Sequence, residues 1–417
     1  MKKGLSALLL ASLLCASSGC QQNQKEVVNE YNIVPMPNQM TPQEGRFLLS
    51  NKVSVVTAGC TPEVQAIADS LIAQIQLTSG ISLKTNSQEN PEQPDIRFVT
   101  EEGMLKEGYK LSIAPNEITL SASHPNGFFY GVQTMYQLLP PAIYGKVTVK
   151  RANWSLPAVE IEDAPRFPYR GLMLDVCRHF STTDYIYKFI DMLAMHKMNT
   201  FHFHLTDDQG WRIEIKKYPK LQEIGSKRKE TLIDYYYVNW PQIFDGKEHG
   251  GYYTQEEIKD IVAYAASKYI TVIPEIEMPG HASAAIASYP WLGSSDETIE
   301  VPIRFGKLYP VYNVVDPKVK TFLQDVITEV IELFQCDIIH IGGDEVRFDQ
   351  WEKNPVIADY KAKKGFSSFM DIQIEFTNQM SRFIQERGCS MMGWNEILGK
   401  NLHEDDNISF TDPSQNL

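Results

Sequence analysis

Two adjacent acids, Asp344 and Glu345, are the residues of this chain best placed to do chemistry. They follow an apolar, β-branched run at residues 338–341, which predicts a buried parallel strand, and two glycines that leave room where the strand ends. Adjacent carboxylates repel, so beside apolar walls one tends to hold a proton while the other stays charged. A proton donor beside a stabilising anion suits the cleavage of a glycosidic bond. Taken alone, the segment would equally fit an aspartate helix cap followed by a solvated glutamate.

A repeated order of strand, polar loop and helix must position these acids. Helices are predicted at 254–268, opened by the capping pair Thr254 and Glu257, and at 317–334. Strands are predicted at residues 171–176, 200–205, 271–276, 338–341 and 390–394. Polar or aromatic residues follow each strand: Asp175 and Arg178, Asp207 and Asp208, Glu275 and His281, Asp344 and Glu345, Trp394 and Glu396. This α/β alternation is typical of a (β/α)8 TIM-type barrel. We expect residues 164–417 to form such a barrel, C-terminally incomplete and truncated after about five strands.

The preceding residues, 31–163, have a different sequence pattern, which predicts a small α/β domain. A strand is expected at 53–57, helices at 63–78 and 128–139, and a hairpin over 108–121. This region carries no charged cluster and no glycine-rich loop, so we place no chemistry in it. A proline-rich joint at 163–168 leads into the second region.

Composition and the N-terminus indicate where the protein works. The net charge of −13 and the pI near 5.2 argue against nucleic acid as a partner. Two lysines, an apolar stretch over 5–15 and Ser-Ser-Gly-Cys at 17–20 resemble a bacterial lipoprotein signal peptide, residues 1–20. Lipidated Cys20 would then be the only membrane attachment, with residues 21–30 as a tether. We expect a lipid-anchored protein of the cell envelope, in the periplasm or on the outer membrane; plain secretion is the alternative.

The remaining cysteines, Cys60, Cys177, Cys336 and Cys389, are widely spaced and form no Cys-x-x-Cys pair. We therefore expect neither a zinc site nor a dense disulfide framework, and we interpret all four as structural. No cofactor and no metal is expected.

Six motifs, in order, extend the argument beyond a single acidic pair. They are RGLMLDVCRHF (170–180), FHFHLTDDQGWR (201–212), GGYYT (250–254), VIPEIEMPGH (272–281), IIHIGGDEV (338–346) and GWNEI (393–397). Their order and spacing resemble glycoside hydrolase family 20, the β-N-acetylhexosaminidases, and the likeness runs from about residue 33 to the end. The resemblance implies an exo-acting enzyme that removes terminal GlcNAc or GalNAc from the non-reducing ends of N-acetylated glycans.

The resemblance also implies a retaining, substrate-assisted mechanism, in which the sugar's own acetamide oxygen forms an oxazolinium intermediate. Glu345 would be the general acid and then the base, and Asp344 would orient the acetamide and stabilise its charge. Asp207 and His281 would support the acid through hydrogen bonds. For His281 taken alone, a satisfied core histidine is the alternative.

Substrate-binding positions carry over in the same way. Arg178 resembles an arginine that grips sugar hydroxyls, with a structural salt bridge as its alternative. Trp394 resembles one wall of the acetamide pocket, with core packing as its alternative. Trp351, together with Trp211, is expected to edge the cleft. Further family positions are expected to be mostly buried scaffold: Asp175, His204, Asp208, Glu275 and Glu277.

Two rival functions remain. His202 and His204 alternate along one strand and fit the His-x-His of metal-dependent amidohydrolases, but the later strand ends lack that class's further histidines. The second rival is a non-catalytic or incomplete glycan-binding lipoprotein of the same fold. This alternative is supported by the prediction of only about five barrel strands. The family's later pocket residues cannot be assigned before Leu417. We favour a truncated sequence.

Overall fold

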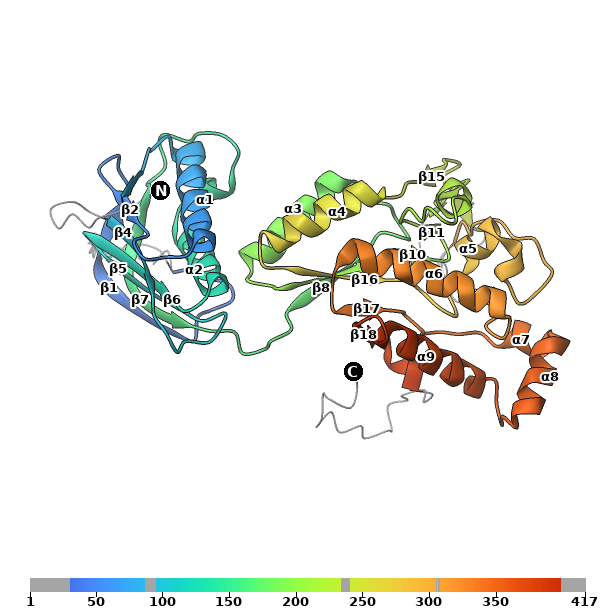
Figure 1. The fold of residues 1–417 in the computed structure, drawn as a ribbon. Helices are drawn as coiled ribbons and strands as arrows, with labels where there is room; N and C mark the ends of the chain where they lie inside the picture. The colour runs from blue at the N-terminus through green and yellow to red at the C-terminus, as the bar shows by residue number, and fades with distance from the viewer. Residues whose placement is uncertain (1–30, 87–94, 234–240, 305, 307, 399–417) are drawn as a thin grey trace, which may run out of the picture.

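The computed structural model describes residues 31–86, 95–233, 241–304, 306 and 308–398. Figure 1 shows them as two bodies, each built on its own sheet. The expected signal peptide and tether lie outside the described residues. Within the described ranges, no helix combines the length and hydrophobicity needed to cross a membrane.

The first body is a seven-stranded sheet in the order β1-β7-β5-β6-β4-β2-β3. Its strands are β1 (Gln39–Leu48), β2 (Ser54–Val56), β3 (Lys84–Asn86), β4 (Asp95–Thr100), β5 (Tyr109–Ala114), β6 (Glu117–Ala122) and β7 (Ser155–Asp163). Helices α1 (Pro62–Ser79) and α2 (Pro125–Leu138) lie on the face toward the second body, and a 3-10 turn, η1 (Pro141–Tyr144), follows α2 (Figure 1). The predicted helices and hairpin are confirmed, with Ile113 opposite Ile118. Strand β1 is almost wholly exposed, so no apolar alternation could indicate it from the sequence.

The second body is a five-stranded parallel sheet, formed by strands in chain order. The strands are β8 (Gly171–Asp175), β9 (Thr200–His204), β16 (Thr271–Glu275), β17 (Ile338–His340) and β18 (Ser390–Met392). Each begins where the sequence predicts and ends one or two residues earlier. Helices α3 (Thr183–Met195), α4 (Gln255–Ala266), α6 (Pro317–Phe334) and α9 (Met370–Gln385) alternate with them. This is the predicted barrel architecture, and β8 and β18 form the edges of the described sheet.

Shorter elements fill the loops between these strands and helices. They are β10 (Thr206–Asp207), β11 (Gly210–Trp211), η2 (Leu221–Gly225), β12 (Lys227–Arg228), β13 (Leu232–Ile233), β14 (Ile243–Phe244), β15 (His249–Gly250), α5 (Ser283–Ser288), η3 (Pro290–Leu292), α7 (Asp349–Lys353), α8 (Pro355–Lys364) and η4 (Asn395–Leu398). Most follow the carboxyl end of a strand, so they surround the edge where the predicted site residues lie.

Local signals start the outer helices where the sequence indicates. The Thr254 side chain accepts a hydrogen bond from the Glu257 backbone N–H, and the Glu257 carboxylate accepts one from the Thr254 backbone N–H, so the predicted capping box of α4 is confirmed. Helix α6 starts at an Asp316 cap with proline in its first turn. Its apolar stripe is buried, as the helical spacing requires: Val319, Phe322, Leu323, Val326, Ile327, Val330, Leu333 and Phe334.

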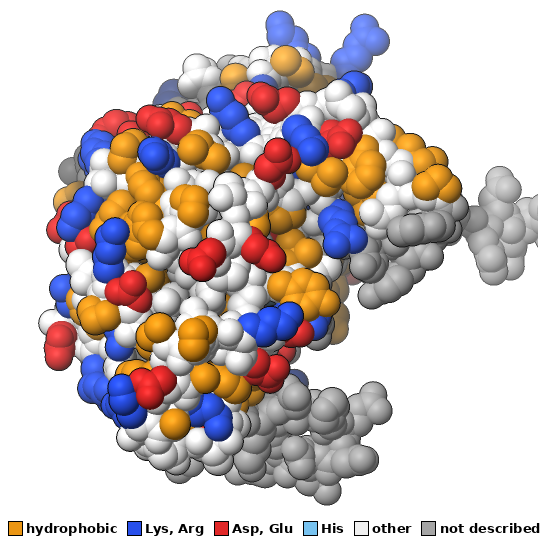
Figure 2. All heavy atoms as spheres, turned by 90° about the vertical axis from the view of Figure 1, so that its right-hand side faces the viewer, with side chains coloured by type: hydrophobic (Ala, Val, Ile, Leu, Met, Phe, Trp, Pro, Cys, Tyr) orange, Lys and Arg blue, Asp and Glu red, His pale blue; other side chains and the backbone are white. Residues whose placement is uncertain are grey.

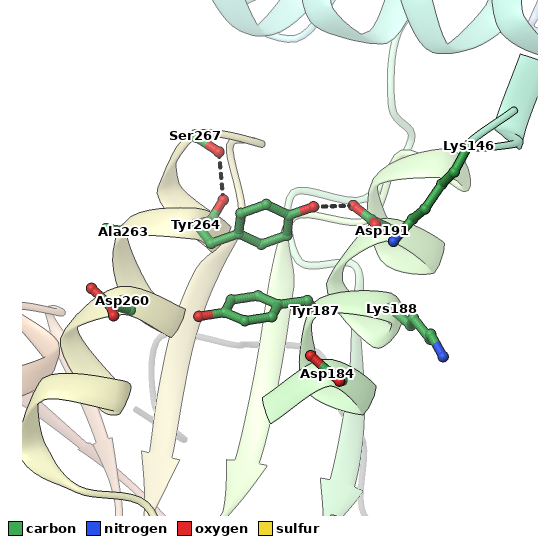
Figure 3. A pocket seen from close by; sticks show the side chains of 9 residues that line it. All are labelled: Lys146, Asp184, Tyr187, Lys188, Asp191, Asp260, Ala263, Tyr264 and Ser267. Carbon is green, nitrogen blue, oxygen red and sulfur yellow. Dashed lines mark hydrogen bonds between the residues drawn. The ribbon is translucent and has the colours of Figure 1, made fainter. Parts of the chain in front are cut away.

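Helices α3 and α4 pack through a pair of tyrosines (Figure 3). The Tyr187 and Tyr264 rings meet edge to face at 4.9 Å, and Tyr264 donates a hydrogen bond of 2.7 Å to Asp191. A pocket opens here on the outer helical layer. Its lining comes from the two helices and from Lys146 of the first body, so it lies apart from the strand ends.

The two bodies join at the amino ends of the barrel strands. Arg170, just before β8, makes a two-pronged ion pair with Glu107, at 2.9 and 3.0 Å. Tyr130 of α2 donates to the same carboxylate, and its ring lies beneath the guanidinium. Lys197, just before β9, is buried and reaches Asp163 at 3.1 Å. The first body therefore leaves the carboxyl ends of the strands uncovered.

We predict that Glu107→Gln lowers the free energy of unfolding by about 1–3 kcal/mol, because it leaves the largely buried Arg170 guanidinium without an ionised partner. Urea denaturation followed by circular dichroism measures the change. Glu101→Gln is the matched control, since its pair with Lys110 is solvent-exposed and should contribute little. Equal midpoints for the two variants would contradict a role for Glu107 in joining the bodies.

Candidate active site

The carboxyl ends of the parallel strands gather the predicted site residues at one edge of the sheet. In Figure 1 this edge lies to the right, away from the first body, and Figure 2 looks onto that side. Acidic, basic and hydrophobic side chains are intermixed over the coloured part of this face. Asp207 follows β9, His281 follows β16, and Asp344 with Glu345 follows β17. The sequence expectation that these four share an edge is met.

A tight turn presents the acidic pair. Gly342 and Gly343 have φ of 66° and 93°, in the left-handed region that favours glycine, and Glu345 follows with φ of 49°. A Cβ added to Gly342 would lie 1.8 Å from a carboxylate oxygen of Glu277, so there is no room for a side chain. The Gly343 carbonyl accepts a 2.8 Å hydrogen bond from Gln373 of α9. Backbone conformation and packing together hold the turn in one shape.

His281 lies between the acidic pair and a second pair of acids. Its Nδ1 is 3.2 Å from Asp207 Oδ1 and 3.1 Å from Asp208 Oδ2. Its Nε2 is 3.7 Å from Asp344 Oδ2 and 3.8 Å from Glu345 Oε2. Burial alone would lower the pKa of His281, but hydrogen bonds to the surrounding aspartates raise it well above its ordinary value. The imidazole is therefore positively charged at neutral pH. With a φ of 48°, His281 is, after Glu345, a second non-glycine residue in the left-handed region at this edge.

The carboxylate of Asp207 is fully buried and ties three segments together. It lies 2.8 Å from Arg178 Nη2, 3.0 Å from His204 Nε2 and 3.2 Å from His281 Nδ1. Burial alone would raise the pKa of Asp207, yet the two histidines and the arginine hold it below the usual range. Asp207 thus stays ionised and fixes His281 from behind.

Arg178 forms the salt bridges that were expected as its alternative role. It pairs with Asp175 at 2.8 Å and with Asp207, and its Nε donates to Gln209 at 3.1 Å. Its side chain nevertheless remains 35% exposed. These contacts hold the fork of donors in one orientation, as recognition of paired oxygens requires.

Trp394 is the half-buried aromatic residue at the end of β18. Its indole N–H donates a 2.8 Å hydrogen bond to Glu275, and its ring lies 5.0 Å from that of His340. Its backbone N–H donates to the Gly342 carbonyl at 2.9 Å, so the tryptophan and the acidic turn belong to one framework.

The expectation that Trp351 and Trp211 edge the cleft is wrong. Trp351 is completely buried, and its indole N–H donates to the Tyr312 carbonyl at 3.0 Å. Trp211 is also buried and donates to the Ile213 carbonyl. Both indoles have their polar group satisfied inside the protein, so neither offers a face to a ligand in this structure.

The expected scaffold acids are buried beneath the site. Asp208, Glu275 and Glu277 have almost no exposed surface, as has His204. Burial, together with the charges of Glu275 and Asp344, raises the pKa of Glu277 well above its ordinary value. Glu277 is therefore a neutral acid packed against the glycine turn.

Several of these groups bring potential metal ligands within 4.8 Å of one another, including His202, Glu275 and His340. His202 Nε2 lies 2.7 Å from Glu275 Oε2, which is a hydrogen-bonding distance between the two side chains. His202 and His204 therefore use their shared strand face to contact buried carboxylates.

Two residues that support the site were not singled out from the sequence. Gln373 reaches the glycine turn from a helix thirty residues further along the chain, and His340 packs between Trp394 and His202. His340 could have been found as the inward-facing residue of its predicted strand. Gln373 stands among the polar residues of an amphipathic helix and gave no signal.

Comparisons with known proteins agree with this geometry. Residues 167–412 match the catalytic domain of glycosyl hydrolase family 20, and residues 30–164 match domain 2 of that family. The chain is 38% identical to a β-hexosaminidase of Porphyromonas gingivalis over 94% of its own length and 48% of the relative. It is 35% identical to a β-hexosaminidase of Vibrio furnissii, over 88% of this chain and 57% of that protein. The chain thus spans about half the length of the curated relatives it matches.

Solved structures show the same likeness. A β-N-acetylhexosaminidase from Bacteroides fragilis superposes with a TM-score of 0.72 and 32% identity, covering 88% of this chain and 67% of that one. A Vibrio harveyi exo β-N-acetylglucosaminidase in complex with N-acetylglucosamine superposes with a TM-score of 0.75 and 30% identity. The match covers 89% of this chain and 56% of that one.

The parallel sheet and the acidic pair at its carboxyl edge lie within the region that matches the catalytic domain of a glycosyl hydrolase family. More particularly, the chain belongs to glycosyl hydrolase family 20, with that family's small α/β domain preceding the barrel.

We predict that Gly342→Ala is far more disruptive than Gly388→Ala. Both glycines have left-handed φ, so each alanine costs about 1–2 kcal/mol. Only Gly342 lacks space for a methyl group, and forcing one in should add roughly 1–3 kcal/mol. The denaturation midpoints of the two variants test this prediction. Equal losses of stability would show that the Glu277 side chain moves aside for the added methyl group at little cost.

Proposed function

We propose that this protein is an exo-acting β-N-acetylhexosaminidase that removes terminal GlcNAc or GalNAc from glycans by a retaining, substrate-assisted mechanism. One observation carries the proposal furthest. Among the described residues, Asp344 Oδ1 is buried without a hydrogen-bonding partner, beside the carboxyl group of Glu345. An unsatisfied buried acceptor is costly, and the N–H of a substrate acetamide would satisfy it. Family membership and the names of the relatives support the same reading.

In this mechanism Glu345 gives its proton to the glycosidic oxygen as the bond to the anomeric carbon breaks. The acetamide oxygen attacks that carbon, and the positive charge of the resulting oxazolinium ring lies beside Asp344. Water then opens the ring while Glu345, now ionised, takes the proton back. The charged His281, fixed by Asp207, keeps both carboxyl groups in place throughout.

Arg178 and Trp394 are proposed to bind the sugar. The anchored guanidinium would donate hydrogen bonds to paired hydroxyls, and the indole would supply an apolar wall for the acetamide methyl and the sugar ring. Trp351 has no part in this arrangement.

The first test compares hydrolysis of an aryl β-N-acetylglucosaminide with that of the matching aryl β-glucoside by the full chain. Cleavage of the N-acetyl sugar alone is the expected result, because only that sugar carries the internal nucleophile. Equal rates on both would refute acetamide assistance. Binding without cleavage would favour the glycan-binding alternative for this chain.

Substitutions in the acidic pair should separate its two roles. We predict that Glu345→Gln slows substrates with poor leaving groups by about 10²–10⁴-fold while binding persists, because the proton donor is lost. Asp344→Asn should lose most activity on N-acetyl sugars, since the positive charge loses its counter-ion. Glu352→Gln, on the exposed face of α7, is the matched control. Wild-type kcat/KM in either acidic-pair variant would overturn its assignment.

We also propose that Cys20 is lipidated and anchors the protein in the cell envelope. Residues 1–20 supply the support, through their charged start, apolar stretch and Ser-Ser-Gly-Cys sequence. In a bacterial host, metabolic labelling with a fatty acid should mark the wild type and Cys15→Ala but not Cys20→Ala. Label retained by Cys20→Ala would refute the anchor, and the protein would then be secreted.

A further inference from the structure

The carboxylate of Glu275, at the end of β16, is completely buried at the centre of the barrel edge. Its Oε1 accepts the indole N–H of Trp394 at 2.8 Å and lies 2.9 Å from His340 Nδ1. Its Oε2 lies 2.7 Å from His202 Nε2 and 3.3 Å from His204 Nδ1. One carboxylate therefore contacts side chains from the two strands on either side of β16 and from the end of β18.

This carboxylate is charged. Burial alone would raise the pKa of Glu275, but hydrogen bonds from His202 and His340 and the charge of His204 hold it below its ordinary range. A hydrogen bond to an ionised acceptor is shorter and about twice as strong as one between neutral groups. The indole N–H of Trp394 is a donor with no other hydrogen-bonding group in its side chain, so this single bond fixes the direction of the ring.

The surroundings complete the fixation of Trp394. Its ring lies 5.0 Å from His340 at an interplanar angle of 68°, and 5.7 Å from His202 at 37°. Its backbone is hydrogen-bonded to Gly342, just before the acidic pair. Trp394 is nevertheless only half-buried, so part of its side chain stays accessible while the ring contacts the two histidines.

We propose that Glu275 is a positioning residue that holds Trp394 as a rigid wall of the substrate pocket and thereby sets the size of N-acyl group that the enzyme accepts. This inference rests on the proposed function. Glu275 touches no reacting atom; it acts through the indole. A fixed wall admits an acetyl group and excludes longer acyl chains, whereas a loosened wall admits both.

The test uses Glu275→Gln in the full chain and observes the wall directly. Glutamine keeps the size but removes the charge. In ¹⁵N–¹H spectra the Trp394 indole signal, identified by its absence from Trp394→Phe, should move upfield as its hydrogen bond weakens. The indoles of Trp154, Trp211 and Trp351 donate to backbone carbonyls elsewhere, so their unchanged signals report an intact fold.

Glu277→Gln is the matched control for the Trp394 signal. Glu277 is also buried, two residues further along the chain, but it is neutral, and no contact between it and Trp394 is found among the described residues. Its amide variant should leave the Trp394 resonance in place. An equal movement in both glutamine variants would overturn the assignment to Glu275.

Turnover provides the second readout. In Glu275→Gln, kcat/KM for an aryl N-acetylglucosaminide should fall by about 10²-fold, as expected for a misplaced pocket wall. The fall in kcat/KM for the N-butanoyl analogue should be smaller, so the ratio of kcat/KM for the acetyl substrate to that for the butanoyl substrate should decrease. A general structural defect would lower both rates equally, and that result overturns the proposal.

Trp394→Phe removes the same hydrogen bond from the other side and keeps an aromatic ring. It should also lower the preference for acetyl over butanoyl substrates. The double variant with Glu275→Gln should have a kcat/KM no lower than that of the more severe single variant. Full acetyl preference in Trp394→Phe would overturn the inference, even if Glu275→Gln fails to fold. If the wild type hydrolyses neither sugar, the proposed function fails, while the Trp394 signal still decides whether Glu275 holds the indole.

Discussion

The buried, ionised carboxylate of Asp207 is the contact on which the rest of the site depends. An isolated charge in the interior would be prohibitively unfavourable, so the fold must surround it with cationic groups. It does so with Arg178 from the loop after β8, His204 from β9 and His281 from the loop after β16. Each of these side chains then faces a different part of the site. Satisfying one buried charge thereby orients both the arginine that we propose binds the sugar and the histidine beside the acidic pair.

The same principle operates a second time, deeper in the barrel, at Glu275. There the partners are a histidine from each flanking strand and an indole N–H, and the carboxylate belongs to the middle strand of the five. Glu277, two residues beyond Glu275, is kept neutral by burial and by the charges near it, and it packs against Gly342. Neighbouring carboxyl groups thus differ in charge because their immediate partners differ. Since Glu277 is neutral, no uncompensated negative charge is added beside the two ionised acids.

The strands, the capped helices and the edge that carries the acids could be predicted, because β-branched runs, capping residues and polar strand ends are local signals. Strand β1 could not, since its residues are mostly exposed and lack alternation. Gln373 could not either, because its role depends on a contact between a helix and a distant turn. Trp351 misled for a physical reason. It stands among charged residues of a five-residue helix, which suggests exposure, but a helix that short has a single inward position, and the tryptophan occupies it.

The placement of the small α/β domain has a consequence for how the protein meets its surroundings. That domain packs against the amino ends of the strands through Glu107 and Asp163, and the chain enters it at residue 31. The acidic pair follows β17, at the opposite, carboxyl end of the parallel strands. If the chain is held through Cys20, its attachment lies on the side of this small domain, and the acidic pair lies at the far end of the barrel. On that attachment, glycan ends would meet the acidic pair at the end of the barrel away from the small domain, which carries none of the site residues.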